Sequence, residues 1–210
     1  MTRLSAPPLV IIGAGGHARV LIDALKLSEK SILGVVDSAY AAGSAGPFGL
    51  TVLGGDEAVD RFRSNEVLLI NGVGTTKTTT KRDEVYRRFL AKGFHFATVV
   101  HPSAVISSSA NLGEGAQVMA GCVIQTGARI GANSIINTRA SVDHDCRIGE
   151  TVHIAPGATL SGSVTVGDGV HIGTGAVIIQ GISIGRHCLV AAGAVVYRDL
   201  PDGTHHIKGD

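Results

Sequence analysis

The residues of this chain best suited to acid–base chemistry near neutral pH are its nine histidines. His144 stands out among them because two carboxylates flank it, in the order Asp143-His144-Asp145. An imidazole beside a carboxylate can act as a general base and take the proton of an attacking amine or hydroxyl group. His144 is therefore the first candidate for a catalytic residue, with an exposed polar side chain as the alternative explanation.

A second group of residues is suited to binding phosphate. The segment Gly13–Ala18 reads Gly-Ala-Gly-Gly-His-Ala, and Asp37 follows about twenty residues later, which fits the dinucleotide-binding pattern. Backbone N–H groups at the start of such a helix favour a phosphate. Because only about 100 residues precede the repeat described below, a mononucleotide or a nucleotide sugar fits better than NAD. A plain strand–helix turn remains the alternative.

The residues around this segment predict a short α/β unit. Strands are expected at residues 9–12, 32–36 and 67–70, and helices at residues 19–27 and roughly 79–92. Lys77 and Arg82 could pair with a phosphate, although a solvated charged helix is the more common explanation of such residues.

The second half of the chain repeats an aliphatic side chain every six residues from Ile106 to Val196. All sixteen positions of this register are Ile, Val or Leu. An α-helix cannot produce such a pattern, because its apolar positions recur at 3.6 residues. A register four residues later holds small or β-branched side chains and includes Cys122, Cys146 and Cys188, which are therefore expected to be buried free thiols.

A glycine register sets the size of one coil. The glycines recur every eighteen residues, at Gly113, Gly131, Gly149, Gly167 and Gly185. Three hexads then make one turn of a triangular solenoid of about five coils, and we expect these glycines at a corner with positive φ. The expected organisation is an α/β nucleotide-binding domain over residues 1–100 and a parallel β-helix over residues 101–210.

Composition excludes several classes of function. The formal net charge is +1 and no basic stripe runs along the chain, so nucleic acid and anionic membranes are not expected partners. The apolar run at residues 9–12 is too short for a signal peptide or a membrane-spanning helix. A soluble cytoplasmic protein is the simplest expectation.

Together these features resemble the hexapeptide-repeat acyltransferases, in particular those that acetylate 4-amino-dideoxy sugars carried on UDP or GDP. The resemblance covers nearly the whole chain and rests on the turn Gly13–His17, Asp37, the junction His101–Ala104 and the segment Asp143–Cys146. It implies a left-handed β-helix, acetyl-CoA as co-substrate without a metal, and a homotrimer that binds coenzyme A between neighbouring β-helices. Related enzymes of sialic acid metabolism keep O-acetylation open as an alternative.

The resemblance also implies roles for individual residues. His144 would be the general base, Asp145 would orient its imidazole where the family often has Glu, Asn137 would lie near the reaction centre, and His153 would contact acetyl-CoA or its thioester carbonyl. Small residues expected along the coenzyme A groove are Gly162, Gly173, Thr174, Ala192 and Gly193. Residues expected to bind the nucleotide sugar are Gly13, Gly15, Gly16, His17, Asp37 and Gly74.

The eighteen-residue period places these candidates relative to one another. Asn137 and His153 fall near one corner on stacked coils, whereas His144 falls more than a third of a turn away. We therefore expect His144 of one subunit to face Asn137 and His153 of its neighbour, in an active site between subunits.

Two other functions are compatible with parts of the sequence, and the chain departs once from the family pattern. His153 and His171 are eighteen residues apart, as in a β-helical zinc enzyme of the γ-carbonic anhydrase type, but no His pair with four intervening residues accompanies them. A non-enzymatic scaffold would leave the His144–Asp145 pair unexplained. The chain also lacks the family's usual Gly-x-Pro-Ala-Lys ending, and His205 and His206 are expected in a disordered polar tail.

Overall fold

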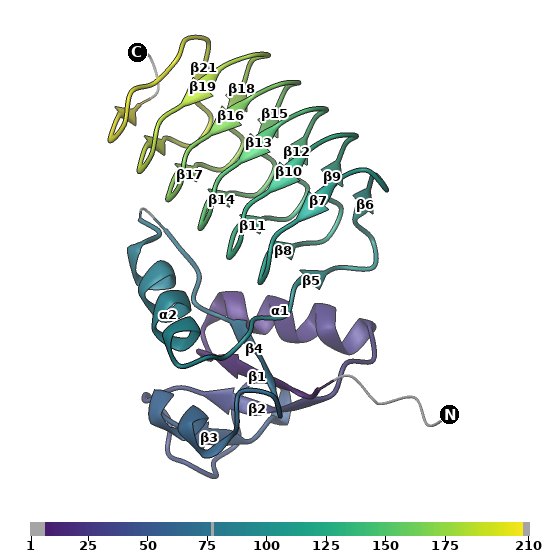
Figure 1. Ribbon diagram of the computed structural model, residues 1–210, viewed down its shortest axis with the longest axis vertical. Helices are drawn as coiled ribbons and strands as arrows, with labels where there is room; N and C mark the ends of the chain where they lie inside the picture. The colour runs from purple at the N-terminus through teal and green to yellow at the C-terminus, as the bar shows by residue number, and fades with distance from the viewer. Residues whose placement is uncertain (1–6, 77, 208–210) are drawn as a thin grey trace.

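The computed structural model describes residues 7–76 and 78–207, so the predicted role of Lys77 lies outside the described residues. The N-terminal part is a four-stranded parallel sheet in the order β3-β2-β1-β4, with helices on both faces (Figure 1). The strands are β1 (Leu9–Ile12), β2 (Ile32–Val36), β3 (Val52–Gly54) and β4 (Leu68–Asn71). The helices are α1 (Gly16–Leu27) and α2 (Thr80–Ala91), with short 3₁₀ turns η1 (Pro47–Gly49) and η2 (Asp56–Arg61). No helix within the described ranges is long and apolar enough to cross a membrane.

The C-terminal part is a β-helix of eighteen two-residue strands in three parallel sheets. The first sheet contains β5 (Val99–Val100), β8 (Gln117–Val118), β11 (Ile135–Ile136), β14 (His153–Ile154), β17 (His171–Ile172), β20 (Leu189–Val190) and β22 (His205–His206). The second contains β6 (Val105–Ile106), β9 (Val123–Ile124), β12 (Ser141–Val142), β15 (Thr159–Leu160), β18 (Val177–Ile178) and β21 (Val195–Val196). The third contains β7 (Asn111–Leu112), β10 (Arg129–Ile130), β13 (Arg147–Ile148), β16 (Thr165–Val166) and β19 (Ser183–Ile184).

The six-residue register maps directly onto these strands. In β6 to β21 the aliphatic residue is the second of each strand and its side chain points inward, while the first residue points outward; Val142 and Ile154, for example, are fully buried. Neighbouring strands pair in parallel with an offset of eighteen residues, as in Ile130 with Ile148. The three cysteines are buried free thiols, as expected.

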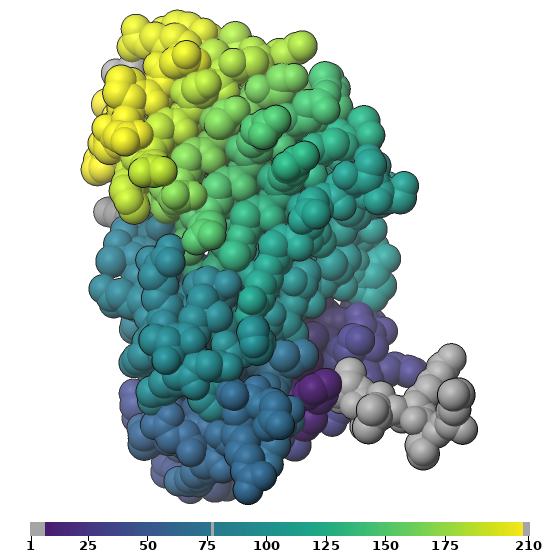
Figure 2. Space-filling model, in the orientation of Figure 1, coloured from purple at the N-terminus to yellow at the C-terminus, as the bar shows by residue number. Residues whose placement is uncertain are grey.

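The two domains share one hydrophobic core. In Figure 1, α1 lies beneath the first coils of the β-helix. Leu21 and Leu25 of α1 belong to the same buried cluster as Val99 and Val118 of the first sheet. A solenoid exposes apolar side chains at an open end unless something covers it, so the N-terminal domain caps the β-helix. The face shown in Figure 2 is accordingly continuous from one domain to the other.

The predicted role of the glycine register was wrong. Gly113, Gly131, Gly149, Gly167 and Gly185 are absent from the residues with positive φ. They are glycine because successive coils approach closely there, and a Cβ on Gly131 would lie 2.2 Å from the carbonyl oxygen of Gly149. Positive φ, between 52° and 68°, occurs two residues later, at Gly115, Asn133, Thr151, Gly169 and His187.

The end of the chain also differs from expectation. His205 and His206 are not a disordered tail but form β22, which pairs with β20, and His206 is buried. Leu189 pairs with His205, so this last coil is two residues shorter than the others. The shortening ends the six-residue phase, which is why the sequence pattern did not reveal the strand.

Replacing Gly131 with alanine should therefore destabilise the β-helix. The new methyl group would clash with rigid backbone of the next coil, at a cost of at least about 2 kcal/mol. Gly175→Asn is the matched control, because Gly175 has φ +66° with open space around it, and Asn133 already adopts such a φ. Thermal unfolding should show a clear loss for the first variant and little change for the second; equal losses would contradict this explanation.

Candidate active site

A pocket of about 520 Å³ lies at the carboxyl ends of β1, β2 and β4. The strand order reverses at β1, and ligands of open α/β sheets bind at such a point. The pocket is lined by Gly13, Gly15, Gly16, His17, Asp37, Gly72, Val73, Gly74, Thr75, Thr76 and Lys81. All six residues expected to bind a nucleotide sugar are thus brought together; we call this space the acceptor pocket.

The carboxylate of Asp37 holds the glycine-rich loop of the acceptor pocket in place. Asp37 accepts hydrogen bonds from the backbone N–H groups of Ala14 (2.8 Å) and Ala39 (2.9 Å), so its carboxylate orders the loop. Gly15 precedes α1 without a side-chain cap, which leaves N–H groups of the first turn available to an anion. Gly74 is required for space, because a Cβ there would lie 2.9 Å from Cβ of His17.

His17 joins the pocket to the β-helix. Its Nε2 lies 2.7 Å from Oε1 of Gln117 in β8, and the Gln117 amide in turn donates to the carbonyl of Asn71 (2.8 Å). His17 therefore donates through Nε2–H. Burial, with the nearby Arg82 charge, lowers the pKa of His17 to about 4, so the ring is neutral near pH 7.

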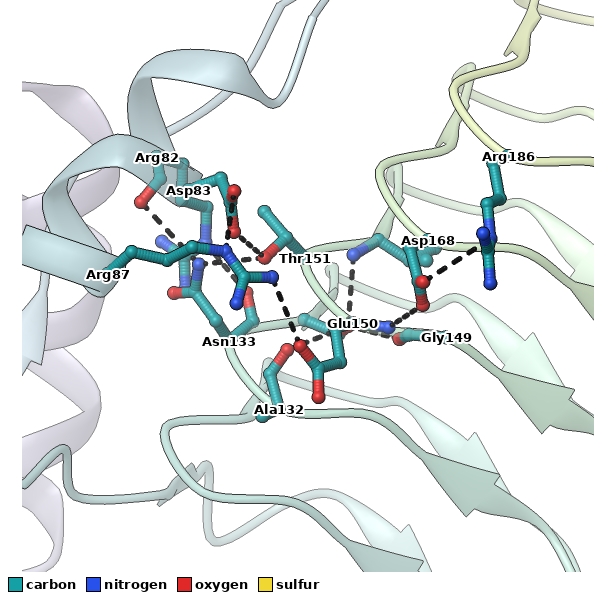
Figure 3. A network of polar contacts seen from close by, with 12 residues as sticks. Arg82, Asp83, Arg87, Ala132, Asn133, Gly149, Glu150, Thr151, Asp168 and Arg186 are labelled. Carbon is teal, nitrogen blue, oxygen red and sulfur yellow. Dashed lines mark hydrogen bonds and ion pairs between the residues drawn. The ribbon is translucent and has the colours of Figure 1, made fainter. Parts of the chain in front are cut away.

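A buried polar cluster fixes the N-terminal domain on the β-helix (Figure 3). Asn71 Nδ2 donates to Oδ1 of Asn133 (3.0 Å), and Asn133 Nδ2 donates to Thr151 (3.1 Å). Thr151 donates to Asp83 of α2 at 2.9 Å. At the surface, Arg87 joins Asp83 to Glu150, at 3.0 and 3.2 Å. Exposed ion pairs add little stability, so the buried amides carry this contact.

Arg82 is buried rather than part of a solvated helix face, which corrects the sequence-based expectation. Its Nη1 donates to the carbonyls of Asn71 (2.9 Å) and Val73 (2.8 Å), and its Nε donates to that of Asn133 (2.9 Å). Burial lowers the pKa of Arg82 to about 9, so the guanidinium still carries its charge near neutral pH. Its Nη2 is buried with no hydrogen-bond partner in the described part of the chain.

His153 lies on the outer face of the first sheet, where the loop between β4 and α2 of the N-terminal domain covers it. Its Nε2 is 3.0 Å from Nδ2 of Asn137, and its Nδ1 is hydrogen-bonded to the hydroxyl of Thr75. The predicted proximity of Asn137 and His153 is thus confirmed. Burial, followed by neighbouring positive charge, lowers the pKa of His153 to about 3. The ring of His171 stands edge to face with that of His153, at a centroid distance of 4.9 Å.

His144 lies at a different edge of the β-helix, between the second and third sheets. Its side chain is 44% exposed, and its Nδ1 is 2.9 Å from Oδ2 of Asp145. The shorter Asp side chain therefore reaches the imidazole, and this hydrogen bond raises the pKa of His144. The ring packs over Gly162, where a Cβ would lie 2.3 Å from Nε2.

The residues expected along the coenzyme A groove divide between two edges. Gly173, Thr174, Ala192 and Gly193 lie on the edge that carries Asn137, where the first sheet turns into the second. Gly193 donates its N–H to the carbonyl of Thr174 at 2.8 Å, which stacks these turns. Gly162 instead lies with His144. One chain therefore holds two half-sites on separate edges.

Two family models match the chain: the PglD N-terminal domain over residues 8–89, and the bacterial transferase hexapeptide (six repeats) over residues 127–162 and 163–198. A histidine-to-asparagine variant of perosamine N-acetyltransferase from Caulobacter crescentus, in complex with CoA and GDP-perosamine, is 40% identical, with a TM-score of 0.86. That match covers 93% of this chain and 90% of the other. The chain belongs to the hexapeptide-repeat nucleotide-sugar N-acetyltransferase family.

Two further relatives agree with this family. The acetyltransferase domain of PglB from Neisseria gonorrhoeae, in complex with acetyl coenzyme A, is 35% identical with a TM-score of 0.86, over 93% of each chain. UDP-N-acetylbacillosamine N-acetyltransferase from Bacillus subtilis is 40% identical over 115 residues, 53% of this chain and 51% of that enzyme. The match thus spans about half of this curated relative. Membership confirms the left-handed form of the β-helix and the acyltransferase class.

The zinc alternative has no support in the geometry. His153 and His171 do stack on successive coils, as their spacing predicts. Among the described residues, however, no three His, Cys, Asp or Glu side chains are grouped so that they could hold a metal ion. The family membership favours acyl transfer instead.

Sequence reasoning missed four residues of this site, Asn71, Thr75, Gln117 and Asn133, and it did not predict that Arg82 is buried. Asn133 carried a weak signal, because it stands in a six-residue register where glycine is the commonest residue. Gln117 carried no such signal, because its register also holds polar residues such as Arg129 and Ser141. Arg82 carried none, since a lone arginine in a charged helix reads as a surface residue. Its burial depends on how the domains meet.

Removing the Arg82 charge should raise the pKa of His17. Arg82→Met keeps much of the volume but removes the positive charge that disfavours the imidazolium form, so the pKa should rise from about 4. It should stay below its ordinary value, because burial is the larger cause. NMR titration of the His17 ring measures this, with Arg87→Met on the exposed side of α2 as the control. An unchanged His17 titration in folded Arg82→Met would contradict the assignment.

Proposed function

We propose that this protein transfers the acetyl group of acetyl-CoA to the 4-amino group of a UDP- or GDP-linked amino-dideoxy sugar. The observation that carries this proposal is the position of the acceptor pocket. Its wall residue Thr75 touches His153, so a nucleotide bound at the glycine-rich loop would direct its sugar toward the Asn137 edge of an acyltransferase-type β-helix. Two of the relatives named above, from Caulobacter crescentus and Bacillus subtilis, are N-acetyltransferases named for nucleotide-linked amino sugars, which favours N-acetylation over O-acetylation. A cytoplasmic location stays a prediction.

The chemistry is a direct acyl transfer. The sugar amine attacks the thioester carbonyl, the C–N bond forms, and the C–S bond of the tetrahedral intermediate then breaks. Asp145 holds the Nδ1–H of His144, which leaves Nε2 free to take the amine proton. The proton passes from the imidazolium to the departing thiolate of coenzyme A, so the products are the amide and the free thiol.

The two half-sites favour an active site between subunits. His144 with Gly162 would come from one subunit, and Asn137 with His153 from its neighbour in a homotrimer. Exposed apolar side chains on the second sheet support such an association: Val105, Val177 and Val195 are 65%, 38% and 50% exposed. Val177 and Val195 are neighbours in this sheet, and Ser141 and Thr159 lie between them and the Val105 end. Exposed apolar side chains gathered in this way are typical of an interaction surface.

Replacing His144 with alanine should lower kcat about 10²- to 10⁴-fold, the usual contribution of a general base. Acetyl-CoA turnover with UDP- and GDP-linked 4-amino sugars measures it, with His95→Ala as control, because His95 forms a similar imidazole–carboxylate pair with Glu114 elsewhere.

Turnover requires neutral His144, whose pKa Asp145 raises. Asp145→Asn should therefore lower that pKa and move the acidic limb of kcat/KM to lower pH. Full activity of His144→Ala would overturn the mechanism, and a lack of turnover by the unmodified protein with every such sugar would overturn the proposed function.

Mixing two variants of low activity should restore activity if the site lies between subunits. When His144→Ala and Asn137→Ala chains are unfolded together and reassembled at equal amounts, about a quarter of the interfaces carry both native residues. Activity should recover to about that fraction of the unmodified protein. A mixture as inactive as its components would place both residues in one subunit's site.

A further inference from the structure

Thr75 belongs to both the acceptor pocket and the β-helix. It lies in the loop between β4 and α2, where it lines the pocket, and its hydroxyl contacts Nδ1 of His153. The same hydroxyl is 3.4 Å from Nδ1 of His171. No other residue that lines the acceptor pocket has a recorded hydrogen bond to His153 within the described ranges. Thr75 is thus a direct link between a bound acceptor and the residues beside the acyl group.

The orientation of the Asn137 amide can be assigned from its neighbours. Its Oδ1 accepts the backbone N–H of Thr138 at 2.8 Å, a donor that cannot change its role. The NH₂ group of Asn137 must therefore face Nε2 of His153, at 3.0 Å. An NH₂ group only donates, so Nε2 of His153 is the acceptor and carries no proton.

The protonation of His153 follows from this orientation. Burial and the positive charge of Arg82, together with the adjacent His171 and His17 rings, keep the imidazole neutral near pH 7. A neutral ring with an unprotonated Nε2 has its proton on Nδ1. Nδ1–H then donates to the Thr75 oxygen, and the Thr75 hydroxyl is free to point toward His171.

We propose that Thr75 is a positioning residue: its hydroxyl oxygen accepts the Nδ1–H of His153, which stabilises the tautomer that the Asn137 amide requires and so keeps that amide oriented for the reacting acyl group. The last step rests on the proposed acetyl transfer, whereas the tautomer does not. A carboxamide has two N–H hydrogens, and His153 takes only one of them. The other can donate to the thioester oxygen as negative charge develops there.

This arrangement gives His153 a different role from the one that the resemblance implies. In this tautomer His153 offers no N–H to a thioester carbonyl, because its one proton is directed at Thr75. The donor to the acyl oxygen is Asn137, and His153 acts by holding it.

The first test is NMR of the imidazole nitrogens of His153 in the intact protein without substrates, assigned with a His153→Asn variant. The unmodified protein and Thr75→Ser should show a protonated Nδ1 and an unprotonated Nε2. Thr75→Val keeps the shape but removes the acceptor, so the signal should move toward the other tautomer and the Asn137 side-chain amide signals should shift. Thr78→Val in the same loop is the control, because the recorded partner of that hydroxyl is Thr80.

The second test is kinetic. Thr75→Val should lower kcat roughly 10- to 100-fold, as loss of one oriented donor does, while KM for acetyl-CoA changes little. Thr75→Ser should restore the rate and Thr78→Val should keep it. Asn137→Ala should mask the effect, so that the double variant is no slower than Asn137→Ala alone.

The outcomes separate this inference from the proposed function. A protonated Nε2 in the unmodified protein would overturn the inference, as would His153 and Asn137 signals that do not change in Thr75→Val. If the tautomer and amide signals respond as expected but no nucleotide sugar is acetylated, the link through Thr75 stands and the proposed acetyl transfer fails.

Discussion

The buried guanidinium of Arg82 is the interaction on which the candidate site depends. It has no carboxylate partner among the described residues and is held by the carbonyls of Asn71, Val73 and Asn133. Two of these carbonyls begin the loop that runs to Thr75, and the third lies at a corner of the β-helix. A buried charge held in this way is costly to disturb, because losing any acceptor leaves it uncompensated. The loop of the acceptor pocket is consequently fixed against the coils that carry His153.

The eighteen-residue coil imposes the second constraint. A side chain on one edge of a triangular solenoid repeats on that edge every eighteen residues, so residues seven positions apart, such as Asn137 and His144, must lie on different edges. No rotamer can bring them together within one chain, because the rigid coil separates them. Chemistry that needs both residues therefore requires two edges from different chains to meet.

Whether a feature of the structure could be predicted depends on how far apart in the sequence its interacting residues are. The β-helix was predictable because its aliphatic register is local and repeats sixteen times. Five of the six pocket residues were predictable because the strand–turn–helix pattern of Gly13–His17 and the strand end at Asp37 are also local; the sixth, Gly74, follows the strand expected at residues 67–70. The prediction of positive φ at the glycines of the eighteen-residue register was wrong because glycine serves two purposes in this β-helix. It allows positive φ at Gly115, and it allows close packing of successive coils at Gly131.

The contacts between the domains were not predictable for the same reason. Asn71 and Asn133 are 62 residues apart, and Thr75 and His153 are 78 apart. No periodicity relates a loop of one domain to a coil of the other. The docking of α1 and α2 on the β-helix decides which polar side chains become buried, and Arg82 is one of them, because its Nε donates to the carbonyl of Asn133 in the β-helix.

The same docking separates the histidines by function. Where the N-terminal domain covers the first sheet, burial lowers the pKa of His17, His153 and His171, so these rings stay neutral and serve as fixed donors and acceptors. His144 lies outside that cover, and Asp145 raises its pKa instead. A residue that must both take and release a proton near neutral pH needs a pKa near neutral pH. A residue that only positions others must keep one protonation state at that pH. His144 is accordingly the histidine of this site that is suited to proton transfer.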